Sequence, residues 1–122
     1  MPTPAVDSES MIPLTPAVFH ILLALSSGPL HGYAIMQSVA ETTGGRMEMG
    51  PGTLYGTVKR LLESGLISES EDRPKAALDD ERRRYYQLTT LGERVLAAET
   101  RRLDQMVRMA RRKGIRPGSV TA

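Results

Sequence analysis

The chain has 122 residues, of which 25% are charged, and its formal net charge is +2, so its length and composition fit one small soluble domain. It contains no cysteine, which excludes disulfides, thiolate metal sites and a cysteine nucleophile, and its two histidines are too few for most histidine-built metal centres. Because no apolar run is long enough to cross a bilayer and no signal-peptide pattern is present, we expect a cytoplasmic protein without a membrane segment, a metal or a cofactor.

The charge is distributed unevenly along the sequence. Residues 1–50 contain one basic and four acidic side chains, whereas residues 51–122 contain 15 basic and ten acidic ones. Polarised charge on a small domain favours a polyanionic partner such as nucleic acid, although many solvated surfaces share this property.

The first part of the chain divides into an arm and a helix. Residues 1–13 contain three prolines and no apolar period, which predicts a disordered arm. Thr15 and Pro16 then suit the N-cap and the first position of a helix that runs to Leu25 and stops at a Ser-Ser-Gly-Pro sequence. Because apolar residues surround most of this helix, we expect it to bury two sides, one in its own core and one against another surface.

A second helix is predicted over residues 31–40, and a Thr-Gly-Gly sequence ends it. Its inward stripe consists of Ile35, Met36 and Val39. His31, beside a glycine at the start of this helix, is expected to bind backbone groups rather than a metal. Residues 46–49 then alternate in character, which indicates a short strand or an extended connection.

A third helix is predicted to begin at Pro51 and to end before Gly65, which suits the position just past a helix C-terminus. Its apolar face has a helical spacing and consists of Leu54, Val58, Leu61 and Leu62. Its other face carries small, hydroxyl-bearing and basic residues, namely Thr53, Tyr55, Gly56, Thr57, Lys59 and Arg60.

A β-hairpin with a long tip is predicted next. Residues 66–70 and 84–88 form its strands, and the segment 71–83 between them is almost wholly charged and contains a proline. On the second strand, Tyr86 and Leu88 are expected on one face and Tyr85 on the other.

The last predicted helix runs from Leu91 to Lys113 and would be about 34 Å long. Thr90 with Glu93 fits a capping box at its start, and Thr89 is an equally suitable cap. A 4-3-4-3 spacing along this helix is typical of a seam that packs on a partner helix, and it is formed by Leu96, Thr100, Leu103, Val107 and Ala110.

Three helices followed by a hairpin are typical of a winged helix-turn-helix, so the expected fold is mainly α with a small β-hairpin and a long C-terminal helix. In such domains the third helix lies in the DNA major groove and the hairpin tip reaches the backbone or the minor groove. Hydroxyl and basic side chains on one face of the third helix suit that role, as does the positive end of its dipole. The same residues would also form the solvated side of any amphipathic helix, and both interpretations remain open for this helix alone.

The hairpin tip favours the nucleic-acid interpretation. In or near this tip lie the basic residues Arg73, Lys75, Arg82, Arg83 and Arg84. Five acidic residues lie close by and offset this charge locally, so we expect a wing that binds DNA weakly or through only some of its arginines.

Four motifs occur in a fixed order along the chain. They are Leu30-His31-Gly32-Tyr33-Ala34-Ile35, Gly50-Pro51-Gly52-Thr53-Leu54-Tyr55, Arg60-Leu61-Leu62-Glu63-Ser64-Gly65-Leu66-Ile67 and Arg83-Arg84-Tyr85-Tyr86-Gln87-Leu88-Thr89-Thr90-Leu91-Gly92. Together they resemble the PadR family of bacterial transcriptional regulators over residues 17–112. Without a larger C-terminal domain, the chain is similar to the short subfamily that ends in a single long helix.

The resemblance implies a homodimer in which the last helix packs against the partner's first helix. It also implies repression at a pseudo-palindromic operator in double-stranded DNA, relieved by a small effector or another signal. We expect a disordered arm over residues 1–13, a winged-helix domain over 14–90, a dimerisation helix over 91–113 and a flexible tail over 114–122.

The expected functional residues fall into two sets. The DNA-binding set is Tyr33, Pro51, Gly52, Thr53, Tyr55, Thr57, Lys59, Arg60, Arg73, Lys75, Arg82 and Arg83. The dimer-interface set is Phe19, Leu22, Leu23, Leu96, Leu103, Met106, Val107 and Ala110.

Two alternatives remain at the level of sequence. Some short members of the family bind flat aromatic compounds between tryptophans, and this chain has no tryptophan. Leu103, Met106 and Met109 would line an adaptable apolar effector site instead, or would simply be dimer packing. A winged helix also serves as a protein-interaction module that does not bind DNA. An enzyme is not expected, because no catalytic triad, phosphate loop or carboxylate pair is present.

Overall fold

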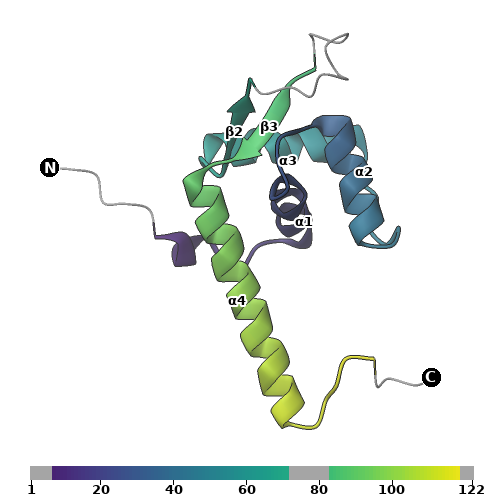
Figure 1. Cartoon of the computed structure of the whole chain (residues 1–122), viewed down its shortest axis with the longest axis vertical. Coiled ribbons are helices and arrows are strands. Elements are labelled where there is room, and N and C mark those ends of the chain that lie inside the picture. Colours follow the sequence, from purple (N-terminus) through teal and green to yellow (C-terminus); the bar gives the residue numbers. More distant parts are fainter. Residues whose placement is uncertain (1–6, 72–82, 119–122) are drawn as a thin grey trace, which may run out of the picture.

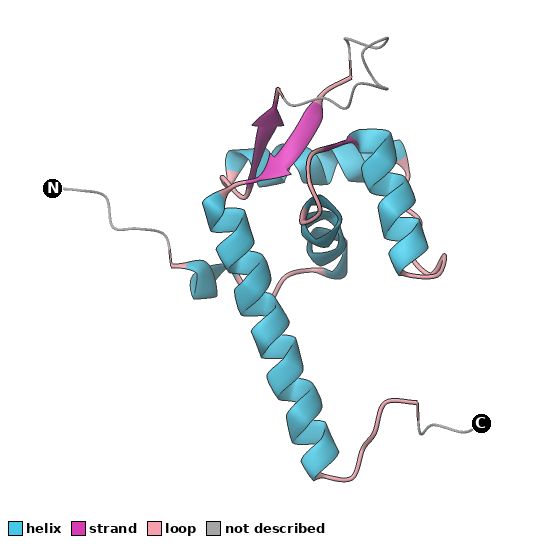
Figure 2. Ribbon diagram, viewed as in Figure 1, coloured by secondary structure: helices cyan, strands magenta, loops and turns pink. Residues whose placement is uncertain are grey.

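The computed structural model describes residues 7–71 and 83–118. Within them the chain forms the 3₁₀-helix η1 (Ser8–Met11), four α-helices and three short strands, in the order α1 (Pro16–Leu25), β1 (Leu30–His31), α2 (Gly32–Thr42), α3 (Pro51–Glu63), β2 (Ile67–Ser70), β3 (Tyr85–Leu88) and α4 (Thr90–Arg112). Figure 2 shows a helical body with the sheet at one end and α4 running away from it. The predicted winged helix-turn-helix with a long C-terminal helix is confirmed.

The sheet has one strand more than the predicted hairpin. The strand order is β1-β3-β2 and both pairings are antiparallel, with Leu30 opposite Tyr86 and Ile67 opposite Leu88. A two-residue strand such as β1 is too short to show alternation in the sequence. Because β1 leads directly into α2, its pairing with β3 fixes the start of α2 against the wing.

The core lies where α1, α2, α3 and the first half of α4 meet. Ile21, Ile35, Leu54 and Val95 are fully buried there, one from each helix. Tyr86 belongs to this core cluster. Tyr85, on the opposite face of β3, instead packs edge-on against the His31 ring, with ring centroids 5.3 Å apart. The predicted alternation along this strand is therefore confirmed.

The start of α4 is held tightly against the base of the wing. Thr89 is the N-cap, because its Oγ1 accepts from the Gly92 backbone N–H at 3.0 Å, so Thr89 rather than Thr90 caps the helix. The same hydroxyl donates to the Gly65 carbonyl oxygen at 2.6 Å. A Cβ at Gly92 would overlap the carbonyl oxygen of Leu66, so only glycine allows this close approach. Gly65 itself has φ +79°, a left-handed conformation that ends α3 as predicted.

The N-terminal arm is ordered where the structure describes it, so the prediction of disorder is wrong for residues 7–13, while residues 1–6 lie outside the described residues. The backbone N–H of Leu14 donates to Glu99 Oε2 at 2.7 Å, and Met11 and Ile12 pack against the core. Glu99 on α4 is only 1% exposed, and Arg102 donates to both of its carboxylate oxygens. These contacts anchor the arm, and no local sequence signal reveals them.

The second half of α4 projects beyond the other helices (Figure 1). Its side chains from Leu103 to Met109 are exposed, including four large apolar ones. None of the helices within the described ranges combines the length and apolar character that a bilayer crossing requires.

Candidate nucleic-acid interface

One face of α3 is exposed, and no acidic residue lies between Pro51 and Arg60. Thr53, Lys59 and Arg60 are exposed, and the Tyr55 side chain is 50% exposed. Gly50 is the N-cap and provides no side-chain hydrogen bond, so the first N–H groups of α3 lack a side-chain cap. Pro51 and Gly52 are exposed at this end, and a Cβ at Gly52 would meet open space. The face therefore combines hydroxyl donors, two cations and the positive end of a helix dipole.

Thr57 does not belong to this face, contrary to the prediction. It is 2% exposed, and its Oγ1 donates to the Thr53 carbonyl oxygen at 2.8 Å. It lies three residues after Leu54 and four before Leu61, so the helical period places it beside the apolar stripe. Arg60 Nη2 donates to the same hydroxyl at 3.2 Å, so Thr57 orients Arg60 on the face instead of reaching DNA itself.

The start of α2 lies next to Tyr55 and the wing. The predicted residue Tyr33 is 58% exposed there. His31 caps α2, because its Nδ1 accepts from the Ala34 N–H at 3.2 Å, which confirms its expected backbone role. Its Nε2 lies 3.4 Å from Arg83 Nη1. The predicted residues Tyr33, Tyr55 and Arg83 thus come together around the N-terminus of α2.

A hollow of about 380 Å³ separates these elements. Residues from α2, α3 and the wing line it, namely His31, Gly32, Tyr33, Tyr55, Arg83, Arg84 and Tyr86. Four of them were absent from the predicted DNA-binding set: His31, Gly32, Arg84 and Tyr86. Their positions in two of the four family motifs were the available signal.

The wing is only partly described. Arg73, Lys75 and Arg82 lie outside the described residues, so their predicted DNA contacts remain predictions. Arg84 Nη1 and Glu69 Oε1 form an exposed ion pair at 3.3 Å. An acidic side chain therefore offsets one wing arginine, in line with the expected mixed charge of the wing.

The predicted dimer-interface residues separate into buried and exposed groups. Leu22 is fully buried within the core of the protomer, so its assignment to an interface is wrong. Leu96 is 9% exposed and lines a surface groove, so its place in the interface stays a prediction. Phe19 and Ala110 are half-buried. The others are exposed, with fractions of 36% for Leu23 and Leu103, 47% for Met106 and 40% for Val107.

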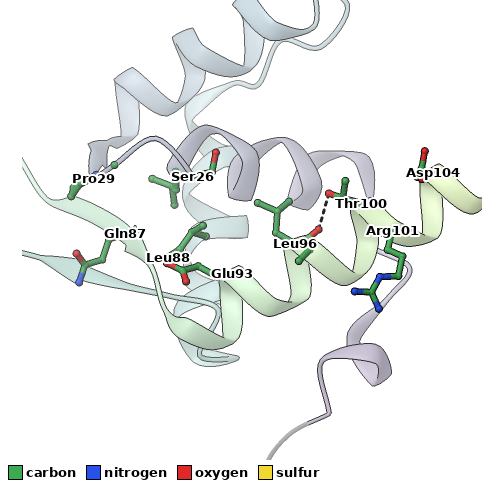
Figure 3. Close-up of a pocket in the computed structure, with 12 residues that line it drawn as sticks. Ser26, Pro29, Gln87, Leu88, Glu93, Leu96, Thr100, Arg101 and Asp104 are labelled. Carbon is green, nitrogen blue, oxygen red and sulfur yellow. Dashed lines mark hydrogen bonds between the residues drawn. The ribbon is translucent and has the colours of Figure 1, made fainter.

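A groove of about 890 Å³ lies between the end of α1, the base of the wing and the first half of α4 (Figure 3). Its apolar wall includes Leu25, Leu88, Leu96 and Ala97. Its polar rim includes Glu93, Thr100, Arg101 and Asp104, and Thr100 Oγ1 donates to the Leu96 carbonyl oxygen at 2.8 Å. None of the residues considered for an effector site from the sequence (Leu103, Met106 and Met109) lines this groove.

No metal centre is apparent in the described part of the chain, where no three His, Cys, Asp or Glu side chains are grouped to hold an ion.

The chain is similar to known transcriptional regulators. It matches the model of the Transcriptional regulator PadR-like family over residues 21–98. It is 34% identical to Transcriptional regulator Rv3488 of Mycobacterium tuberculosis over 89 residues, which are 73% of this chain and 77% of that protein. It is 35% identical over 86 residues to an uncharacterised 37.1 kDa protein of a Streptomyces fradiae transposon, covering 70% of this chain and spanning only 22% of that protein's length.

Solved structures support the same assignment. The hsRosR-S4 complex, which contains RosR of H. salinarum, superposes with a TM-score of 0.67 at 26% identity and covers 83% of this chain and 81% of that one. A PadR-like transcription factor of Bacteroides fragilis superposes with a TM-score of 0.58 at 28% identity and covers 76% of this chain and 87% of that one. The chain therefore belongs to the PadR-like family of transcriptional regulators and is a DNA-binding regulator with a winged-helix fold.

Proposed function

We propose that the protein is a homodimeric repressor that binds a pseudo-palindromic operator with one α3 helix in each half-site. The observation that carries this proposal is the exposed, acid-free face of α3, which presents Thr53, Tyr55, Lys59 and Arg60 beside an uncapped helix N-terminus. Hydroxyl and guanidinium groups form hydrogen bonds with base edges and with phosphates, and a helix N-terminus favours a phosphate. A surface for docking protein would display more large apolar groups, and on this face Tyr55 alone is large and exposed.

The dimer is supported by the projecting half of α4. Leu103, Met106 and Val107 form an exposed apolar stripe along a helix that makes few contacts with its own protomer. A second copy of α4 with the partner's α1, where Leu23 is exposed, would cover this stripe. Two-fold symmetry then places two α3 helices in major grooves about one helical turn apart, roughly 34 Å along the DNA.

Replacing Lys59 with glutamine tests the contact between α3 and DNA. Affinity for specific and non-specific duplexes is expected to fall together, because an ammonium that contacts phosphate carries no base information. The slope of log K against log salt concentration is expected to decrease by about one unit per subunit. Fluorescence anisotropy over a salt series measures both. Lys113→Gln, beyond the end of α4, is the matched control, and an unchanged slope for Lys59→Gln would show that Lys59 does not touch phosphate.

The groove beside α4 is the proposed effector site. Its apolar wall and polar rim suit a flat apolar or aromatic compound, and it connects the wing with the dimerisation helix. Such a ligand is expected to raise the melting temperature, because it binds only the folded state. A thermal-shift screen with planar aromatic compounds measures this, and Ala97→Arg, which places a long side chain in the groove, is expected to abolish the shift. Absence of a shift with every compound would oppose this part of the proposal.

A further inference from the structure

The hollow between α2, α3 and β3 is lined by tyrosine and arginine side chains, which can donate hydrogen bonds to a ligand. We propose that it clamps one phosphodiester of the DNA backbone, held by the hydroxyls of Tyr55 and Tyr86, the N-terminus of α2 and the wing arginines. This inference rests on the proposed function, since it assumes that DNA lies on the exposed face of α3. It assigns a role to Gly32 and Tyr86, which the comparison with the family leaves without one.

Gly32 forms a notch that seats the Tyr55 side chain. A Cβ built on Gly32 would overlap the Tyr55 hydroxyl and would lie 2.8 Å from Tyr55 Cζ. A real Cβ does not approach other atoms so closely, so the glycine is what allows the phenol to rest on the start of α2. Tyr55 is still 50% exposed, and its hydroxyl is thereby held at the positive end of the α2 dipole.

Tyr86 points to a ligand independently of the helix terminus. It is 5% exposed and lines the hollow, and within residues 7–71 and 83–118 its hydroxyl has no hydrogen-bond partner. The Tyr86 ring is enclosed, but its hydroxyl oxygen stays accessible from the hollow, where a ligand oxygen in place of solvent would accept its hydrogen bond. Burial, together with the nearby Tyr55 and Glu69, raises the pKa of Tyr86 against the opposing effect of Arg84, so the hydroxyl keeps its proton and donates.

The lining is suited to an anion. Arg83 and Arg84 contribute two guanidinium groups, and none of the seven lining residues is acidic. Glu69 pairs with Arg84 from outside the lining, at 3.3 Å. Phenol hydroxyls, guanidinium groups and a helix N-terminus all donate, which matches the non-ester oxygens of a phosphate better than a base edge.

The DNA backbone is the source of this phosphate that the geometry favours. Tyr55 belongs both to the hollow and to the exposed face of α3, so a duplex on that face would bring its backbone over the hollow. Tyr33, 58% exposed, borders the opening from the side of α2. The clamp would set the position of α3 along the groove without reading sequence.

The test measures binding of Tyr86→Phe and Gly32→Ala to the selected operator, with Tyr85→Phe as the matched control. Tyr86→Phe is expected to bind about tenfold more weakly, because a hydrogen bond to a charged group is lost. Gly32→Ala is expected to give a similar loss by displacing Tyr55, and no further loss in a Tyr55→Ala background. Tyr85→Phe removes a hydroxyl from the neighbouring residue on the other face of β3 and is expected to bind like the unmodified protein.

Duplexes with single methylphosphonate substitutions locate the phosphate. At one position in each half-site, the uncharged linkage is expected to remove the difference between Tyr86→Phe and the unmodified protein. Operator binding unaffected by both Tyr86→Phe and Gly32→Ala, or a loss that no methylphosphonate removes, would overturn the clamp while leaving the repressor function intact. An effect of Tyr86→Phe on inorganic phosphate binding alone would also overturn it. A protein that selects no DNA would overturn the proposed function first.

Discussion

Replacement of Leu103 by glutamate is expected to convert the dimer to a monomer and to weaken operator binding by about 100-fold or more. Full burial of a leucine side chain contributes about 1.5–3 kcal/mol, of which the 36% of Leu103 that is exposed supplies a part, and glutamate adds the larger cost of a charge inside the interface, on both sides of the two-fold axis. A loss of about 3 kcal/mol alone lowers the association constant by more than two orders of magnitude. A monomer then binds a half-site without the high effective concentration that links two binding domains.

Mass photometry or analytical ultracentrifugation, combined with anisotropy on the operator, measures this effect. Leu103 is 36% exposed in the protomer, so the folded monomer is expected to keep its helical circular dichroism. Gln105→Glu introduces the same carboxylate two residues away, on the opposite side of α4, and is expected to leave the dimer intact. A Leu103→Glu variant that stays dimeric would contradict the role of this stripe.

Replacement of Glu99 by glutamine is expected to lower the free energy of unfolding by about 2 kcal/mol at neutral pH, the scale of one hydrogen bond to a buried charge. The carboxylate is 1% exposed and accepts from Arg102 and from the Leu14 N–H, so it joins the N-terminal arm to α4. The Arg102 hydrogen bond, and then that of Leu14, hold the pKa of Glu99 below its ordinary value against the opposing effect of burial.

The lowered pKa of Glu99 determines how its contribution to the free energy of unfolding depends on pH. Because the folded-state pKa is lowered, the stabilisation by Glu99 is fully present above the unfolded-state pKa, near 4.5. It is lost as the pH falls from that value through the lower folded-state pKa. Urea unfolding at pH 7 and at a series of acidic pH values measures the difference between the two proteins, which is expected to shrink on acidification. Asp104→Asn, in an exposed pair with Arg108, is the control with little expected change, and a difference that is constant with pH would refute the linkage.

The sequence predicted what depends on local pattern. The start and the end of α3 follow from Pro51 and Gly65, and the start of α4 follows from the Thr89-Thr90 pair. The two faces of β3 follow from the alternation of Tyr85 and Tyr86. The choice between Thr89 and Thr90 as a cap required the structure, because it depends on the distant Gly65 carbonyl that Thr89 also binds.

Errors arose where long-range contacts override local pattern and, at Thr57, where the helical period was overlooked. The arm looked disordered because its anchor, Glu99, lies 85 residues from Leu14. Thr57 looked like a DNA contact because its hydroxyl is polar, whereas its helical position buries it beside Leu54 and Leu61. Leu22 looked like part of a second apolar side of α1, yet the protomer core encloses it completely. The hollow around Tyr86 required three separate segments to be brought together, which no single motif encodes.

Selection of bound duplexes from a random DNA pool at near-physiological salt, with the mass of the protein measured in the same sample, tests the repressor function most directly. Enrichment of an inverted repeat by a particle with the mass of two chains is expected. Its half-sites should be centred about one helical turn apart. A dimer that binds no DNA at any salt concentration would contradict the proposal and favour a protein-docking module.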